Sequence, residues 1–191
     1  MQTTSHFIGA KMEPSVFIDL FVDMYQYLKN NNVRDCLEFY NPLSVHITLY
    51  YLDSDISEQK NQIEKWILDI NKEILNTKIF IDSVSFFENE GKETMGYLHT
   101  LNFTWLQKTN SQLSKLFPNS VKDNTQTYVP HLSLFKIKNH QVFSEHKTSI
   151  LQIIDRHLQV IKKHNSFKSI SLYSVNSNFK PEIQIEMGQS T

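Results

Sequence analysis

Apolar residues along the chain follow two periods, and the alternation between them divides the sequence into helices and strands. Where apolar residues recur every three or four positions, the pattern predicts a helix with one buried face. Such stretches begin after Pro14 and after Ser57, end near Pro118, and span about 142–163. Their apolar stripes are Phe17, Leu20, Phe21, Met24 and Leu28; Ile63, Trp66, Ile67, Ile70 and Ile74; Leu106, Leu113, Leu116 and Phe117; and Ile150, Ile153, Ile154, Leu158 and Ile161.

Short runs of β-branched and aromatic residues predict strands between these helices. A polar turn at 88–93 joins two of them, another turn at 176–181 joins the last two, and a polar loop at 119–127 precedes the strand that begins near 129. The runs cover about 6–11, 44–52, 78–87, 94–103, 129–134, 167–175 and 182–187. Two of these strands, 44–52 and 129–134, are each followed by an amphipathic helix, which indicates a duplicated strand-and-helix unit.

The same two strands carry a matched pair of motifs. His46-Ile-Thr48-Leu and His131-Leu-Ser133-Leu lie 85 residues apart, each flanked by apolar strand residues. Side chains two positions apart on a strand point to the same side, so each motif presents one imidazole and one hydroxyl to one face. The intervening residues Ile47, Leu49, Leu132 and Leu134 are then buried on the other face.

Two further His-x-Ser/Thr patterns, at 146–148 and 164–166, belong to the last predicted helix and its end. Residues two apart on a helix lie on different sides of its axis, so neither pattern can form such a face. If the two motif strands are neighbours, two imidazoles and two hydroxyls meet, which is the equipment for acid–base chemistry at a phosphodiester. The alternative is that His46 and His131 are half-buried strand histidines bonded to nearby hydroxyls.

The paired motifs, the Pro130 before the second histidine, the strand context and the chain length resemble those of the 2H phosphoesterases, also called LigT-like or 2′-5′ RNA ligase-like proteins. The resemblance covers nearly the whole chain. It implies an α+β, bilobal LigT-like fold in a single domain over 1–191, with two antiparallel-rich sheets related by a pseudo-twofold axis, flanking helices and a central groove. It also implies that His46 and His131 are the catalytic pair and that Thr48 and Ser133 bind the phosphate. Lys136 stands where many members have arginine, which keeps the charge but loses the bidentate fork.

Composition limits the partners that we expect. The 191 residues carry a formal net charge of −1, which argues against a protein that grips long duplex nucleic acid by counterion release. Cys36 is the one cysteine, which excludes a disulfide framework and a cysteine-based zinc site. No secretory signal and no long apolar segment is present, so we expect a cytoplasmic protein that contacts no membrane. We also expect a monomer.

Several residues near the motifs are candidates for substrate binding. Tyr50 and Phe135 lie two positions beyond the hydroxyls and could stack a base at the rim of the groove, although packing in the core explains them equally well. Tyr128 and Lys136 are further rim candidates, and His99 is expected to be a packed or rim histidine. No metal-ligand cluster and no glycine-rich phosphate loop is present, so we expect neither a metal nor another cofactor.

The sequence therefore predicts a metal-independent phosphodiesterase for a small nucleotide or short oligonucleotide. The substrate could be a 2′,3′-cyclic phosphate, a 2′-5′-linked oligonucleotide or a related cyclic nucleotide, including a nucleotide messenger of host defence. The alternative is a non-catalytic module that binds a nucleotide or an RNA end on the same fold. The sequence does not decide which histidine is the acid and which is the base.

Overall fold

The structure is a computed structural model, and it describes residues 5–52, 55–74, 79–101, 103–118, 128–175 and 181–185. Within these ranges the chain forms four α-helices, α1 (Ser15–Asn30), α2 (Lys60–Ile74), α3 (Phe103–Leu116) and α4 (His140–His164). It also forms eight strands, β1 (Ser5–Met12), β2 (Leu37–Phe39), β3 (His46–Leu52), β4 (Ile81–Asn89), β5 (Lys92–Thr100), β6 (His131–Ile137), β7 (Phe167–Val175) and β8 (Pro181–Ile185). The polar loop 119–127 and most of the turn 176–181 lie outside the described residues.

The strands form one sheet in the order β4-β5-β6-β3-β1-β7-β8, and the short β2 also pairs with β6. Every strand pair in it is antiparallel. The two motif strands β3 and β6 are neighbours at its centre, where Ile47 lies opposite Leu132. The predicted α+β class is confirmed, and the two expected sheets are the halves of one sheet that meet at this pair.

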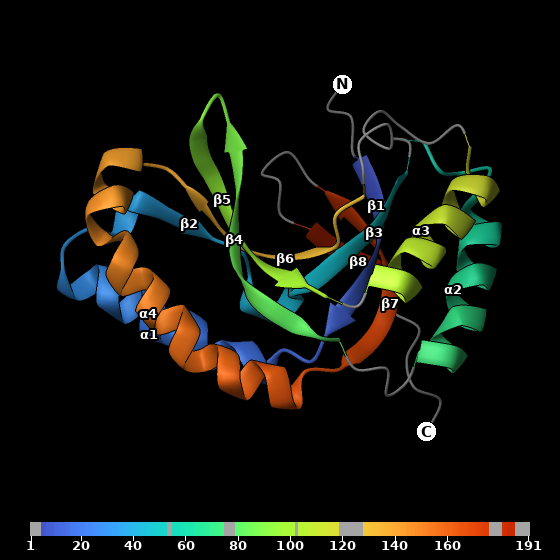
Figure 1. The fold of residues 1–191 in the computed structure, drawn as a ribbon. Coiled ribbons are helices and arrows are strands. Elements are labelled where there is room, and N and C mark those ends of the chain that lie inside the picture. The colour runs from blue at the N-terminus through green and yellow to red at the C-terminus, as the bar shows by residue number, and fades with distance from the viewer. Residues whose placement is uncertain are drawn as a thin grey trace.

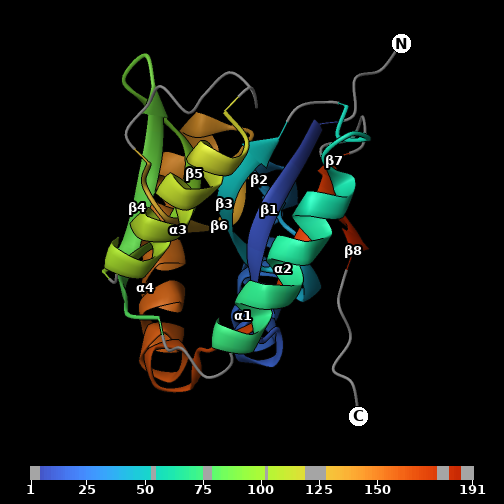
Figure 2. The same ribbon diagram turned by 90° about the vertical axis from the view of Figure 1, so that its right-hand side faces the viewer.

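The four helices lie in two pairs at opposite sides of the molecule (Figure 1). Helices α1 and α4 pack on one another and α4 contacts β4, whereas α2 contacts β7 and α3 contacts β3. Figure 2 shows α2 and α3 on the viewer's side of the strands. The helix before each motif strand therefore contacts an element of the other half of the sequence, α1 with α4 and α3 with β3.

The buried face of the sheet is the one that the helices cover. Ile47, Leu49, Leu132 and Leu134 are all 0% exposed, as the alternation in the motifs predicts. The predicted stripe of α1 is buried along its whole length, because its spacing brings those residues to one side of the helix. No helix in the described part of the chain is long and apolar enough to cross a membrane.

Two local features differ from the sequence prediction. Strand β3 begins at His46 and not at Ser44, because Pro42–Ser44 form a 3-10 turn capped by the Asn41 side chain, which accepts a hydrogen bond from the Leu43 amide at 2.9 Å. Strand β2 has no counterpart in the prediction, since three residues are too few to show a period.

Candidate active site

The motif residues occupy one face of the two central strands. His46, Thr48, His131 and Ser133 are all half-buried, and each alternates with a fully buried residue. We call the surface that these four residues define the motif face. It lies on the side of β3 and β6 opposite the core, because the residues that alternate with these four are 0% exposed.

The register between the two strands brings the motifs together. Ile47 is opposite Leu132, so continuing the antiparallel register by one residue in each direction places His46 opposite Ser133 and Thr48 opposite His131. Directly opposite residues have Cβ atoms about 4.5–5.5 Å apart. Each histidine thus has the other motif's hydroxyl as its cross-strand neighbour, and the pair is close enough for His131 to affect the titration of His46.

Both imidazoles are held in the same orientation by the backbone. His46 Nδ1 lies 2.7 Å from the Ser44 carbonyl oxygen, and His131 Nδ1 lies 2.7 Å from the Val129 carbonyl oxygen. A carbonyl oxygen can only accept a hydrogen bond, so Nδ1 carries the hydrogen in both rings. The neutral form of each ring then has its lone pair on Nε2, where it can accept a proton.

Aromatic rings surround both histidines, but with different geometry. Phe7 and Tyr173 are stacked on the His46 ring, each with its centroid 4.9 Å away. Phe87 and Tyr97 meet the His131 ring edge to face, at 4.7 Å and 5.3 Å. In each half, one of the two aromatic residues comes from the strand next to the motif strand and the other comes from the strand beyond it.

Burial in this apolar setting disfavours the charged imidazolium. It lowers the pKa of His46 from 6.5 to about 4, although the hydrogen bond to Ser44 opposes the shift and His131 adds to it. Burial also lowers the pKa of His131, against the opposing effect of its bond to Val129. Both rings are therefore neutral near pH 7 in the substrate-free protein.

Tyr50 and Phe135 are not at the rim, and this part of the prediction is wrong. Both side chains are in the core, at 2% and 0% exposure, and the Tyr50 hydroxyl donates a hydrogen bond to the Phe117 carbonyl oxygen. The reason is a β-bulge in each motif strand, at Leu49 against β1 and at Leu134 against β5. One extra residue reverses the alternation beyond it, so positions 50 and 135 turn to the core.

The bulges bring two other residues to the motif face. Beyond them, Tyr51 is 47% exposed and Lys136 is half-buried. The Lys136 ammonium lies 5.8 Å from the centroid of the Tyr40 ring. Lys136 stays a candidate for the rim, whereas nothing in the sequence points to Tyr51, because the bulge is not visible there.

Tyr128, the remaining rim candidate, is tied to the first motif. Its hydroxyl donates to the Thr48 carbonyl oxygen at 3.0 Å. Burial raises the pKa of Tyr128 and raises that of Tyr40 to about 12, and Tyr51 contributes to both shifts. Tyr40, Tyr51 and Tyr128 therefore share the same region, and the hydroxyls of Tyr40 and Tyr128 remain protonated at neutral pH.

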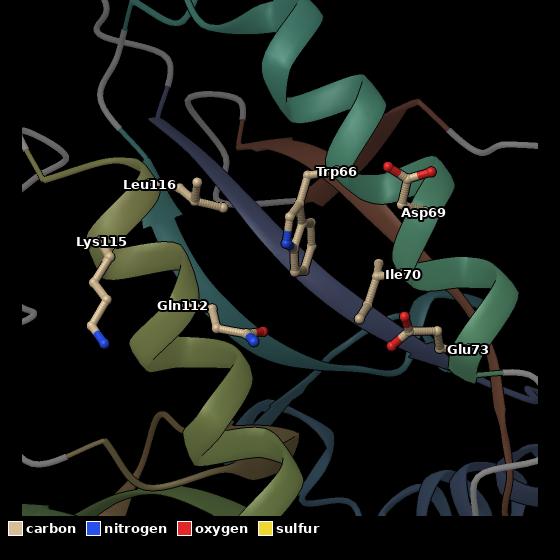
Figure 3. Close-up of a pocket in the computed structure, with 7 residues that line it drawn as sticks. All are labelled: Trp66, Asp69, Ile70, Glu73, Gln112, Lys115 and Leu116. Atoms are coloured by element: carbon tan, nitrogen blue, oxygen red, sulfur yellow. The ribbon is translucent and has the colours of Figure 1, made fainter.

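A separate cavity of about 450 Å³ lies between α2 and α3 (Figure 3). Figure 3 shows the Trp66 indole pointing into it from α2, with Gln112 and Leu116 facing it from α3. Leu116 is 40% exposed there, so it is not the core residue that the stripe of α3 predicts. Neither motif contributes to its walls, and it is therefore distinct from the candidate active site. The described residues contain no cluster of three or more side chains suited to a metal ion.

Comparison with known proteins identifies the fold. No family model and no curated protein matches the sequence. Among solved structures, TT0787 of Thermus thermophilus is 9% identical with a TM-score of 0.55, and the match covers 95% of each chain. Escherichia coli LigT in complex with 3′-AMP is 10% identical with a TM-score of 0.52, over 96% of this chain and 95% of that one. Kluyveromyces marxianus Usb1 with uridine monophosphate is 12% identical with a TM-score of 0.47, over 95% and 97%. This chain therefore has the LigT-like fold, as its resemblance to the 2H phosphoesterases implied.

Proposed function

We propose that this protein is a metal-independent phosphodiesterase that acts on a 2′,3′-cyclic phosphate, a 2′-5′-linked oligonucleotide or a related cyclic nucleotide. One observation carries the proposal. Two imidazoles, each with Nδ1 bound to the backbone and Nε2 left as the basic atom, stand beside two hydroxyls on the motif face. A protein that only bound nucleotides would need hydroxyls and positive charge, but not two imidazoles held in the same tautomer.

The reaction follows from this arrangement. For a 2′,3′-cyclic phosphate, the neutral Nε2 of one histidine removes a proton from water as the oxygen of that water bonds to phosphorus. The bond from phosphorus to one ribose oxygen breaks, and the protonated Nε2 of the other histidine supplies that oxygen with its proton. For a 2′-5′ link, the neighbouring 3′-hydroxyl replaces water and loses its proton to the base. The bond from phosphorus to the 5′-oxygen of the next nucleotide breaks, and that oxygen takes the proton of the acid, so the products are a 2′,3′-cyclic phosphate and a free 5′-hydroxyl. Thr48 and Ser133 donate hydrogen bonds to the non-bridging oxygens as their negative charge grows.

One histidine acts as the base and the other as the acid. The lowered pKa values of both agree with these two roles only if substrate binding raises the pKa of one of them. A base must be neutral, and burial keeps both His46 and His131 neutral at pH 7. The acid must be charged, and an anion within about 4–6 Å favours the charged imidazolium. The bound phosphate itself thus supplies the charge that raises the pKa of the histidine beside the leaving group.

Two observations favour a nucleotide as the ligand. The exposed Tyr51 ring and the Tyr40 ring beside Lys136 are surfaces on which a base can stack. Escherichia coli LigT, which shares this fold, was solved with 3′-AMP bound. A near-neutral chain with few cations suits a short substrate better than a long duplex.

The test is turnover of 2′,3′-cyclic AMP and 2′-5′ oligoadenylate, followed by chromatography of the products. We expect the wild type to be active. His46→Ala and His131→Ala should each lower the turnover rate at least about a hundredfold, which is the scale of the contribution of one general acid or base. His140→Ala is the control, because His140 is exposed at the start of α4. Circular dichroism would confirm that each variant is folded.

Retention of these nucleotides without turnover by the wild type would favour the binding module. A folded single variant with normal turnover would remove that histidine from the mechanism. Extending the assay to cyclic dinucleotides and cyclic oligonucleotides tests whether the substrate is a defence messenger.

A further inference from the structure

The strand registers arrange the residues of the motif face in two rows across four strands. In one row, Lys11 of β1 is opposite His46, which is followed by Ser133 and then by Tyr97 of β5. In the other row, Gly9 of β1 is opposite Thr48, which is followed by His131 and then by His99 of β5.

The two rows are related by the pseudo-twofold axis between Ile47 and Leu132. It exchanges His46 with His131, Thr48 with Ser133, and Lys11 with His99. Each catalytic histidine therefore has a second basic residue as its outer neighbour, one strand further from the centre. Neither Lys11 nor His99 belongs to a motif.

Lys11 faces the same side as the candidate active site. Strand β1 pairs with β7 in continuous register from Phe7 to Lys11, so Phe7 and Lys11 share a face, and Phe7 is stacked on the His46 ring. Ile8, Ala10 and Met12 point to the core and are 0% exposed. His99 likewise shares a face with Tyr97, whose ring contacts His131.

We propose that Lys11 and His99 form two outer anion subsites, one on each side of the scissile phosphate, which bind the phosphates that flank it in the substrate. This inference rests on the proposed function and narrows its substrate class. Linear or cyclic oligonucleotides, which carry a phosphate next to the scissile one, are preferred to mononucleotides.

The places of Lys11 and His99 in the sheet explain why they would bind the flanking phosphates and not the scissile one. In the proposed site the two imidazoles and the two hydroxyls bind the scissile phosphate, and Lys11 lies on the strand next to that of His46, away from His131. Strands are about 4.8 Å apart and residues on a strand rise about 3.3 Å, so three strand steps and the two-residue offset between the rows place Lys11 and His99 roughly 16 Å apart. A phosphate bound between them at the centre has one subsite on each side.

The local charge also favours an anion at Lys11. Lys11 is 8% exposed, and an ammonium in such a site interacts with an anion with less screening than an exposed lysine does. On the other half, Glu38 and Glu93 are each paired with a lysine, Lys138 at 2.8 Å and Lys147 at 2.6 Å. The carboxylates of those strands are thereby neutralised.

The experiment compares two substrates with the same scissile bond. One is the 2′-5′-linked dinucleotide ApA, and the other is this dinucleotide phosphorylated at both ends. For the wild type we expect a higher kcat/KM on the phosphorylated form. The ratio of the two kcat/KM values should fall about tenfold in Lys11→Met and several-fold in His99→Leu, the scale of one hydrogen bond to a charged group.

Lys11→Arg and Lys115→Met are the controls. The first keeps the charge at position 11 and should restore most of the ratio. The second removes the same charge from exposed α3 and should leave the ratio unchanged. The salt dependence gives an independent readout, because loss of one phosphate contact lowers the slope of log(kcat/KM) against log[KCl] by about 0.7–1 for the phosphorylated substrate.

An unchanged ratio and slope in folded Lys11→Met would overturn the proposal. So would an equal loss on both substrates, since Lys11 would then act on the scissile phosphate. If the wild type cleaves neither dinucleotide, the proposed function fails for this class, and calorimetric titration still tests the subsites. Tighter binding of the phosphorylated dinucleotide that Lys11→Met abolishes supports them, and equal binding of the two dinucleotides overturns them.

Discussion

The burial of His46 should make the fold sensitive to acid, and replacing that one side chain should relieve the sensitivity. The pKa of His46 is about 4 in the folded protein against 6.5 for an ordinary histidine. A group with a lowered folded pKa contributes its full stability above pH 6.5, and this contribution is lost as the pH falls, because the unfolded chain binds the proton first. His131 shifts in the same direction and adds to the effect.

The magnitude follows from the distance between pH and pKa. At pH 5 the unfolded imidazole is 1.5 pH units below its pKa and is almost fully protonated, while the folded His46 is almost fully neutral. At about 1.36 kcal/mol per unit, the fold loses about 2 kcal/mol from this group relative to neutral pH. That is a sizeable share of the free energy of unfolding of a typical domain, about 5–15 kcal/mol.

The assay is urea unfolding of the wild type and of His46→Asn at pH 7 and pH 5. Asparagine is suitable because its side-chain amide can still donate to the Ser44 carbonyl oxygen, whereas it does not titrate. The wild type should lose about 2 kcal/mol more than the variant between the two pH values. Carboxylates and histidines that do not interact with His46 affect both proteins equally and cancel in this difference. Equal losses in the two proteins would refute the claim that burial holds His46 neutral.

Four further predictions concern catalysis and packing. kcat/KM should peak on the acid side of pH 6.5, because it reports the free enzyme, in which both catalytic imidazoles have lowered pKa values; a maximum above pH 7 in a pH–rate profile would contradict this. Thr48→Val and Ser133→Ala should lower kcat about ten- to a thousandfold with a smaller change in KM, and steady-state kinetics showing a change in KM alone would make them simple binding contacts. EDTA should leave turnover unchanged, and activity lost in EDTA and restored by a divalent metal would reverse that expectation. Gly96→Ala should cost about 1–3 kcal/mol in urea unfolding, because its Cβ would lie 2.4 Å from the Phe135 ring; Phe135→Leu in the same chain should recover part of the loss, and a stability equal to wild type would show that the ring has room to move.

The sequence predicted the helices and the alternation within each motif well, because these depend on local periodicity. The stripe of α1 and the alternation from His46 to Leu49 needed no knowledge of the rest of the chain. The bulges could not be predicted from the sequence, because an extra residue in a strand is defined only relative to the partner strand. For this reason Tyr50 and Phe135 were assigned to the wrong face, and Tyr51 was missed.

The outer residues of the motif face were missed for a related reason. Lys11 is an ordinary lysine in the sequence, and only the register of β1 places it opposite His46. His99 was read as a packed or rim histidine, and its register against β6 gives it His131 as a neighbour. Which strands are adjacent, and in what register, is decided by the packing of the whole sheet, so no window along the chain could show it.

The exchange of helices between the two halves means that neither half is a complete folding unit. A chain ending after α2 would hold β1, β3 and α2, but α1 would lack the helix α4 on which it packs. Such a chain would also lack β7, which pairs with β1 and contacts α2, and a second copy of the same half contains no β7 to supply that surface. The two halves, produced as separate polypeptides, should accordingly be unstable alone and should assemble when mixed.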